Sequence, residues 1–442
     1  MTSVVIIGHE SAGFTAASTA RAIDKQAEIT VVERNPYPLY HPCGIPFAIS
    51  GELPDIKVLI ENTKPPNIEL RLGTEAKSID PDKKTVKVIE LKSGKTENIP
   101  YDSLIVAIGS YAFRPSIRGT DLKGVYVVRT VEDGEAIIQA TKKAKQAVVV
   151  GGGAIGVETS VALRRRGLEV LLVELMPHLL PTMLDQDMAE LVTQRLQKEG
   201  IRVLCAQQLR EIRGDKNVRS VVVGEKEYPA DLVIVAVGVK PEVRLAKEAG
   251  IELGPTGGIK VDRYLRTSVP EIFAAGDCVE TQNLITGEPT LSQLATTAIR
   301  MGKAAGENAV GGKATFTGTF NTVVTSVHEL IIASTGLTTS AAKKAGIDVV
   351  SARVRMSNKP HYYPGAEPIY VKLLVETGEH KIIGGQVIGT EGVAERVNLL
   401  TLAIQKGMRA DELADIEYCY MPAVCDVIEP LTAAAEVVLR KL

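Results

Sequence analysis

The stretch A-V-V-V-G-G-G-A-I-G-V-E (147–158) decides the fold, because a short β-branched run meets a glycine turn there. The pattern predicts a strand over 147–150, a helix that runs through Arg166, and a further strand over 170–173 that ends at Glu174. This order of strand, glycine turn, helix, strand and acid is typical of a dinucleotide site. Glycines let the backbone approach the pyrophosphate at the helix N-terminus, and the acid accepts hydrogen bonds from ribose hydroxyls.

The carboxylate of Glu174 also bears on which nucleotide binds here. It would repel the additional phosphate of NADPH, so NADH is expected and NADPH is the less favoured nucleotide. The residues predicted to contact this nucleotide are Gly151, Gly153, Ile155, Gly156, Glu158, Glu174 and Gly238.

The same pattern occurs a second time at the start of the chain. A predicted strand over 3–7 meets G-H-E-S-A-G (8–13), and an Ala-rich helix leads to a strand over 29–32 that ends at Glu33. The middle glycine is replaced by Glu10, which puts a carboxylate where a pyrophosphate is expected to pass. The repeat predicts two Rossmann-like domains and two nucleotides.

Length and composition bound the remaining possibilities. The chain has 442 residues, enough for about three domains. Its formal net charge of -2 argues against a nucleic-acid binder, which needs a basic surface. No apolar run approaches the roughly 18 residues of a membrane span, and no signal peptide precedes the first strand, so we expect a cytoplasmic protein. The six histidines lack metal-ligand spacing, which leaves any metal unknown.

Later segments extend the α/β pattern. Apolar runs over 103–109 and 231–238 resemble strands that end in a glycine turn, and a third such strand leads to Asp277. From residue 320 onward no dinucleotide turn occurs. This last part predicts a mixed α+β domain, with strands over 369–375 and 382–388 and helices over 392–406 and 428–439.

Together these segments resemble the two-dinucleotide flavoproteins of the pyridine nucleotide–disulfide oxidoreductase family, over essentially the whole chain. Residues 8–33 resemble that family's FAD turn, and 101–109 its strand before the first crossing between domains. T-S-V-P-E-I-F-A-A-G-D (267–277) resembles its FAD signature, and 294–308 the segment that closes over the flavin ring. By this resemblance, the residues that contact FAD are Gly8, Ser11, Ala12, Gly13, Glu33, Arg34, Ala76, Ala107, Gly109, Asp277 and Ala295.

The resemblance implies three domains in an α/β fold. Residues 1–113 and 246–318 would form the FAD-binding domain, and residues 114–245 an inserted NADH-binding domain. Residues 319–442 would form a C-terminal α+β dimerisation domain, so a homodimer is expected.

The stretch Y-H-P-C-G-I-P-F (40–47) indicates a branch of that family. Reductases of the glutathione reductase type carry a second cysteine five residues on, where this chain has Ala48. A lone cysteine in this motif resembles the branch of coenzyme A–disulfide reductases, NADH oxidases and NADH peroxidases. Cys43 is therefore the expected redox residue, and its place at a possible helix start would lower the thiol pKa.

Other positions separate the members of that branch. Oxidases and peroxidases carry a histidine where this chain has Ser11, which argues against a dedicated peroxidase. Tyr420 resembles the C-terminal tyrosine that acts in the partner subunit's active site of coenzyme A–disulfide reductases. The further candidates for substrate contact are His361, Tyr362, Tyr363 and Arg21, an arginine that fits a phosphate contact.

The coenzyme A pocket is matched less well. The branch usually has two adjacent arginines where this chain has Arg21 and Ala22, and polar residues where it has Leu39 and Pro42. Losing a cation and two polar groups weakens a pocket for a polyanion. The candidate substrates are therefore a coenzyme A disulfide, another small disulfide, a persulfide or a polysulfide.

The sequence thus predicts an FAD-dependent NAD(P)H:disulfide oxidoreductase that works through Cys43. One alternative is an NADH oxidase that cycles through a cysteine sulfenic acid, and another is a non-enzymatic flavoprotein redox sensor that binds NADH. Cys419 and Cys425 flank Tyr420, and they are candidates either for an auxiliary redox pair or for a metal site.

Overall fold

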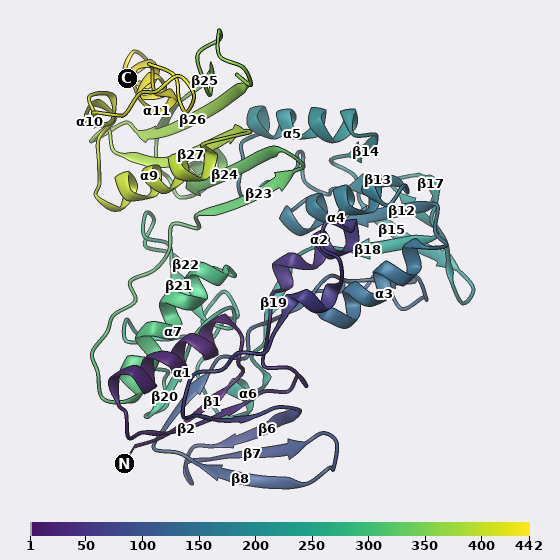
Figure 1. Ribbon diagram of the computed structural model, residues 1–442, viewed down its shortest axis with the longest axis vertical. Coiled ribbons are helices and arrows are strands. Elements are labelled where there is room, and N and C mark those ends of the chain that lie inside the picture. The colour runs from purple at the N-terminus through teal and green to yellow at the C-terminus, as the bar shows by residue number, and fades with distance from the viewer. Residues whose placement is uncertain (1) are drawn as a thin grey trace.

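The computed structural model describes residues 2–442 and contains two parallel sheets of the same design (Figure 1). The first sheet has the strand order β20-β9-β1-β2-β5, and all its neighbouring strands run parallel. Its strands are β20 (Ile272–Ala274), β9 (Ser103–Val106), β1 (Ser3–Ile7), β2 (Glu28–Val32) and β5 (Glu69–Arg71). β1, β9 and β20 are nearly continuous runs of buried apolar residues, as expected for a parallel sheet covered on both faces, whereas no residue of the edge strand β5 is fully buried.

Two helices pack closely beside the first sheet. They are α1 (Ser11–Ile23), from the first glycine turn, and α7 (Ala295–Ala309). A Cβ on Gly302 would lie 2.4 Å from the carbonyl oxygen of Ala12, and one on Gly306 would lie 2.3 Å from that of Ala16. The two helices can therefore pack this closely only because glycine occupies both positions.

The second sheet has the order β11-β18-β12-β13-β14 and is also parallel. Its strands are β11 (Val125–Tyr126), β18 (Leu232–Val235), β12 (Gln146–Val150), β13 (Glu169–Val173) and β14 (Ile201–Leu204). Its helices are α3 (Val131–Thr141), α4 (Ala154–Arg165) and α5 (Gln186–Lys198). The predicted strand–turn–helix–strand pattern is confirmed in both sheets.

Smaller antiparallel elements complete this part of the molecule. The chain segments that join the two domains pair with each other as β10 (Ser110–Ala112) and β19 (Val239–Pro241), and α6 (Arg244–Glu248) follows. One three-stranded sheet is β6 (Thr74–Asp80), β7 (Thr85–Glu90) and β8 (Thr96–Pro100). The other is β15 (Leu209–Gly214), β16 (Val218–Val223) and β17 (Lys226–Pro229). Two more antiparallel pairs remain. One joins β3 (Leu39–Tyr40) to β4 (Ile60–Glu61), and the other is the hairpin of β21 (Glu280–Gln282) and β22 (Pro289–Leu291).

The C-terminal part is an antiparallel sheet with helices packed against it. The strand order is β23-β24-β27-β26-β25, and the predicted strands over 369–375 and 382–388 are β26 and β27, two of its three inner strands. The strands are β23 (Val323–Val327), β24 (Leu330–Gly336), β25 (Val349–Ser357), β26 (Pro368–Glu376) and β27 (Ile382–Gly389). The helices are α8 (Thr339–Lys344), α9 (Val393–Gln405), α10 (Ala410–Ala414) and α11 (Pro430–Leu439). The predicted α+β character is confirmed, and none of the helices within residues 2–442 is long and apolar enough to cross a bilayer.

The segment around Cys43 packs where the sequence did not predict it. It comprises the 3-10 helix η1 (Pro42–Gly44), the helix α2 (Ile45–Ser50) and the 3-10 helix η2 (Ile56–Leu59). Ile45 and Ile49 are fully buried and share a core cluster with Val157 and Val161 of α4. The predicted boundary at residue 113 groups this segment with the first domain, but its side chains pack against the second.

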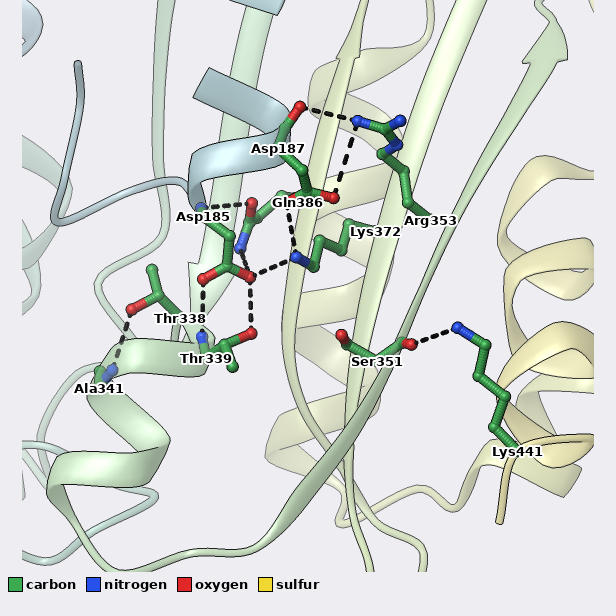
Figure 2. A network of polar contacts seen from close by, with 10 residues as sticks. All are labelled: Asp185, Asp187, Thr338, Thr339, Ala341, Ser351, Arg353, Lys372, Gln386 and Lys441. Carbon is green, nitrogen blue, oxygen red and sulfur yellow. Dashed lines mark hydrogen bonds and ion pairs between the residues drawn. The ribbon is translucent and has the colours of Figure 1, made fainter. Parts of the chain in front are cut away.

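A buried polar network joins the second domain to the C-terminal sheet (Figure 2). The carboxylate of Asp185, just before α5, accepts hydrogen bonds from Thr339 and Gln386 and lies 2.9 Å from the ammonium of Lys372. Lys372 is 10% exposed and also contacts Asp187 at 2.7 Å. Burial alone would raise the pKa of Asp185, but the bonds from Lys372 and Thr339 lower it overall.

Replacing Lys372 with Met should destabilise the protein, because it leaves the Asp185 carboxylate buried without its cation. Breaking one side of a buried pair costs about 3 kcal/mol or more. Lys260→Met is the matched control, since Lys260 pairs with Glu252 at the surface, where the loss is below about 1 kcal/mol. Thermal and urea unfolding midpoints measure both variants, and equal shifts would show that the network does not stabilise the fold.

Candidate nucleotide and redox site

The two glycine turns have the same geometry. A Cβ on Gly8 would lie 2.3 Å from the carbonyl oxygen of Ala107, and one on Gly151 would lie 2.3 Å from that of Ala236. Both glycines also have positive φ, 96° for Gly8 and 107° for Gly151. Glycine is therefore required at each turn by sterics and by backbone conformation.

The acid at the end of each second strand holds its own turn in place. Glu33 accepts hydrogen bonds from the backbone N–H of His9 at 2.8 Å and of Asn35 at 2.7 Å. Glu174 accepts from Gly152 at 2.5 Å and from Met176 at 2.7 Å. Each carboxylate oxygen keeps a second lone pair, so both acids can still accept from a ribose hydroxyl.

The second turn leaves space for a phosphate. A Cβ on Gly153 would meet no protein atom within 4 Å, and the same holds for Gly238. Packing within the chain therefore does not explain the glycine at position 153, whereas a pyrophosphate on the N-terminus of α4 would. These residues fit a dinucleotide. Ile155 is exposed on the first turn of α4, and Gly156 packs against Gly151.

The first turn differs at one residue. Glu10 lies just before α1 with an extended backbone, and it makes no side-chain capping bond to that helix. Burial raises the pKa of Glu10 to about 9, with further increases from Glu33 and Asp277 and a decrease from Arg129. At neutral pH the side chain is therefore protonated and can donate a hydrogen bond to a phosphate. A neutral Glu10 fits beside a pyrophosphate, which an ionised one would repel.

The remaining residues predicted to contact FAD lie around this turn or on neighbouring elements. Ser11, Ala12 and Gly13 form the first turn of α1, and Ala295 is the first residue of α7. Asp277 accepts from Ser110 at 2.8 Å, and its oxygen lies 3.6 Å from Arg129. The other three residues are placed as follows: Gly109 has φ 72°, Ala76 is buried on β6, and Arg34 is exposed.

Arg129 is a member of the site that the sequence did not single out. Its positive charge lowers the pKa of Glu10 and of Cys43, and its guanidinium lies 3.6 Å from the carboxylate of Asp277. Its carbonyl accepts a hydrogen bond from the Tyr40 hydroxyl at 2.7 Å. The local signal was the capping box that starts at Thr130 and fixes the start of α3. Such a box places the preceding residue at a helix N-terminus but does not reveal what that residue faces.

Cys43 lies in η1, and its side chain is exposed. Partial desolvation of the Cys43 thiol raises its pKa, and the nearby carboxyl of Glu158 raises it further. The positive charge of Arg129 lowers this pKa, but by a smaller amount. We expected the start of a helix to lower the pKa of Cys43, and for the protein alone that prediction is wrong. The helix α2 has only six residues, and the carboxyl of Glu158 lies nearby. A thiolate at Cys43 needs additional positive charge or electron withdrawal from a bound group.

Glu158 lies at the junction of three parts of the molecule. It accepts a hydrogen bond from the Thr325 hydroxyl of β23 at 2.6 Å, and burial raises its pKa. It also lines a cavity of about 450 Å³ between α2, α4, α5 and the β23–β24 hairpin, together with Phe47 and His328. Glu158 therefore connects the Cys43 segment, the second glycine turn and the C-terminal sheet.

The predicted aromatic candidates form one cluster on the C-terminal part. The hydroxyls of Tyr362 and Tyr420 lie 3.2 Å apart, and the rings of His361 and Tyr362 meet edge to face at 5.8 Å. Tyr363 follows in the same loop and is half-buried. Within residues 2–442, no hydrogen bond or ion pair joins this cluster to Cys43.

Arg21 does not serve as the predicted phosphate contact. It is 7% exposed, and its two terminal nitrogens donate to the backbone carbonyls of Asp24, Lys25, Ala27 and Asn67. This geometry corrects the sequence interpretation, because the guanidinium closes the end of α1 and faces the protein interior.

Comparisons with known proteins agree with this geometry. The family model described as pyridine nucleotide-disulphide oxidoreductase matches residues 2–302, and the dimerisation domain of the same family matches residues 322–431. An NADH oxidase of Methanocaldococcus jannaschii is 41% identical over 99% of both chains. A CoA-dependent NAD(P)H sulfur oxidoreductase of Pyrococcus furiosus is 32% identical over 98% of both.

A solved structure is similar along almost the whole chain. The NAD-dependent persulfide reductase from A. fulgidus has a TM-score of 0.96 at 38% identity, and the match covers 99% of this chain and 83% of that one. The dimerisation-domain match indicates that two copies associate through the C-terminal part.

Glu10 should make FAD binding sensitive to alkaline pH. The folded pKa of about 9 lies above the ordinary value of the carboxyl, so the neutral form persists at pH 7 and is lost as pH rises through that range. Ionisation then places a negative charge beside the phosphates. Between about pH 8 and about pH 10 we expect flavin affinity to fall about tenfold.

Glu10→Gln is the matched variant, because it has a similar shape and stays neutral at every pH. Its flavin retention, measured by ultrafiltration and visible absorbance, should stay constant over the same pH range. Equal loss of flavin from both proteins would show that another group causes the alkaline effect.

Proposed function

Because the chain belongs to the pyridine nucleotide–disulphide oxidoreductase family, we propose that it is an FAD-dependent NADH:disulfide reductase. The observation that carries this proposal is the exposed thiol of Cys43, which has no second cysteine in its motif and lies near Glu158, the acid on the helix that follows the second nucleotide turn. We further propose a small disulfide, persulfide or polysulfide as the substrate. FAD would be held by the first turn and Asp277, and NADH by the second turn and Glu174.

The lack of a basic pocket near α1 supports a small substrate. Arg21 faces backbone carbonyls, and the neighbouring Ala22 supplies no second cation. A coenzyme A disulfide needs cations for its phosphates, whereas a short disulfide or polysulfide does not. The A. fulgidus relative named for persulfide reduction is consistent with this choice, whereas the Pyrococcus furiosus relative is named as CoA-dependent, so coenzyme A belongs in the substrate panel.

The proposed chemistry at Cys43 is thiol–disulfide exchange. The Cys43 thiolate attacks one sulfur of the substrate, a new S–S bond forms, and the other sulfur leaves as a thiolate that takes up a proton. When bound, FAD and NADH would supply the two electrons that cleave this S–S bond, so that Cys43 returns to the thiol and the second half of the substrate leaves as a thiol. Burial raises the pKa of Glu158, which favours its protonated form and suits it to donate that proton to a leaving sulfur near Cys43.

An NADH oxidase activity is the second candidate. It is favoured by the name of the relative that is 41% identical. In that reaction Cys43 would cycle through a sulfenic acid formed by peroxide. Ser11 stands where the acid–base histidine is expected, so the chain lacks one group that would serve this chemistry.

Replacing Cys43 with Ser should abolish disulfide reduction. Anaerobic NADH consumption with a panel of disulfides and polysulfide should fall by at least about 100-fold, because the hydroxyl of serine cannot form the mixed disulfide. Cys205→Ser is the control, since Cys205 is half-buried near β14 and should leave the rate unchanged.

Flavin content and oxygen uptake complete that test. Unchanged flavin absorbance in Cys43→Ser shows that the cofactor site is intact. A variant that keeps the full disulfide rate would contradict the mechanism, and an aerobic rate above every disulfide rate would favour the oxidase.

Replacing Glu174 with Gln should weaken the preference for NADH. The amide keeps the size of the side chain and one acceptor oxygen for the turn, but it removes the charge that repels the phosphate of NADPH. We expect the ratio of kcat/KM for NADPH to that for NADH to rise about tenfold, which corresponds to about 1.4 kcal/mol. An unchanged ratio would show that Glu174 serves only to hold the turn.

A further inference from the structure

The other two redox candidates do not lie on the segment that carries Cys43. Cys419 and Cys425 belong to the loop between α10 and α11, where the Cys425 thiol donates a hydrogen bond to the carbonyl oxygen of Cys419 at 3.3 Å. Among residues 2–442, no group of three or more His, Cys, Asp or Glu side chains is arranged to hold a metal ion, so the structure does not support a metal site there. The elements that pack around Cys43 are therefore what sets its position.

The segment that carries Cys43 is anchored on the second domain, although the predicted boundary places it in the first. Figure 1 shows α2, in purple, beside α4 and α3, in blue, and their buried side chains share one core cluster. A Cβ on Gly134 of α3 would lie 2.2 Å from the side chain of Ile56 and 3.0 Å from that of Ile45. The missing side chain at position 134 therefore provides the space in which this segment packs.

Arg166 fastens the end of α2 to the end of α4. It directly follows α4, and its guanidinium donates to the carbonyl oxygens of Ile49 at 2.5 Å and of Ala48 at 3.4 Å. These carbonyls belong to the last turn of α2, where helix carbonyls lack partners within the helix and a cation is favourable. Gly51 ends α2 with φ 87°, and a Cβ there would lie 3.3 Å from the same guanidinium. Arg166 thus caps α2 from another helix.

The two arginines that precede Arg166 hold different groups. Arg165 pairs with Glu52 just after α2, but both side chains are largely exposed, and such pairs contribute little. Arg164 donates to two backbone carbonyls within the second domain, at 3.0 Å and 3.3 Å. Arg164 and Arg166 therefore make the same type of bond at the same helix end, and only the bonds of Arg166 reach α2.

The anchored turn is close enough to Cys43 to set its position. The 3-10 helix η1 continues directly into α2, and the backbone N–H of Ile45 donates to the carbonyl of Pro42. A Cβ on Gly44 would lie 2.2 Å from the side chain of Leu59, so η1 also packs tightly against η2. Six residues of helix span about 9 Å. Because the chain is helical from Cys43 to the anchored turn, a displacement of one moves the other.

We propose that Arg166 is a positioning residue for Cys43. It fixes the end of α2 on α4, so the domain that carries the second nucleotide turn determines where the thiol lies. That turn is at the N-terminus of α4 and Arg166 is at its C-terminus, so one helix locates the nicotinamide nucleotide and the thiol relative to each other. This inference rests on the proposed role of Cys43 in the reductase, and it assigns Arg166 no contact with substrate or cofactor.

Three variants of the flavin-loaded, full-length protein test this role. Arg166→Met removes both hydrogen bonds and keeps a side chain of similar length. Arg164→Met is the matched control, because it removes two bonds to backbone carbonyls without touching α2. Arg166→Lys should restore part of the effect, since its ammonium can still donate to a carbonyl, and it carries the same test with smaller changes if Arg166→Met does not fold.

Two measurements follow the Cys43 segment without using the reductase reaction. In Arg166→Met, amide hydrogen exchange over residues 45–53 should become at least about fivefold faster. Alkylation of Cys43 by iodoacetamide, located by mass spectrometry, should become at least about threefold faster, because a loosened segment lets water and reagent reach a thiol that is partly desolvated in its packed position. In Arg164→Met both rates should stay at the wild-type value, even where its thermal midpoint falls as far.

Steady-state kinetics separate positioning from general damage. The substrates are cystamine, glutathione disulfide, coenzyme A disulfide and inorganic polysulfide, and the one that the wild-type protein reduces fastest is used for the variants. In Arg166→Met, kcat should fall at least about fivefold, because the thiol is displaced from its reactive position. KM for NADH should not change, since the second nucleotide turn lies about 18 Å away at the other end of the helix.

Two results would overturn the inference. Exchange and alkylation rates in Arg166→Met that match the Arg164→Met control would show that Arg166 does not hold the segment. Faster exchange with an unchanged kcat would show that it holds α2 without positioning Cys43 for turnover. A wild-type protein that reduces none of the four substrates would instead contradict the reductase proposal, whereas the exchange and alkylation rates would still decide whether Arg166 positions the thiol.

Discussion

The close approach of a glycine to the neighbouring strand is the constraint on which the site depends. At the end of β1 and again at the end of β12, a Cβ would overlap a carbonyl oxygen of the adjacent strand. The helix that follows is held just as closely, since a Cβ on Gly13 would lie 1.9 Å from the oxygen of Gly8, and one on Gly156 would lie 1.8 Å from that of Gly151. These contacts fix where each helix begins, and therefore where its free N–H groups point.

Around these rigid turns, the chain places carboxyl groups whose burial favours the neutral form. Burial raises the pKa of Glu10 at the first turn, of Glu33 behind it and of Glu158 beside Cys43. Arg129 is the basic residue whose charge acts on both Glu10 and Cys43. These charges do not by themselves lower the pKa of the Cys43 thiol below its ordinary value. The reactivity of the thiol must depend on what binds next to it, which limits uncontrolled reaction with disulfides when no cofactor is present.

The elements that could be predicted from the sequence are those whose requirement is local. Each glycine turn depends on residues within a few positions, so both Rossmann-like sheets were predicted correctly, with Glu33 and Glu174 directly after their strands. The environment of Arg21 depends on Asn67, 46 residues away, and the sequence interpretation there was wrong. The bond between Asp187 and Lys372 spans 185 residues, and nothing near either residue signals it. The packing of α2 against α4 is likewise a long-range contact, so a boundary drawn from motifs alone could not include it.

The difference between the two turns follows the different demands on the two nucleotides. The nicotinamide nucleotide must enter and leave in each catalytic cycle, and its turn keeps open space at Gly153. FAD in such enzymes stays bound, and its turn carries Glu10, which is compatible with phosphate only while it holds a proton. Because the phosphates themselves oppose ionisation of Glu10, bound FAD should keep that proton in place, and the proton in turn favours bound FAD.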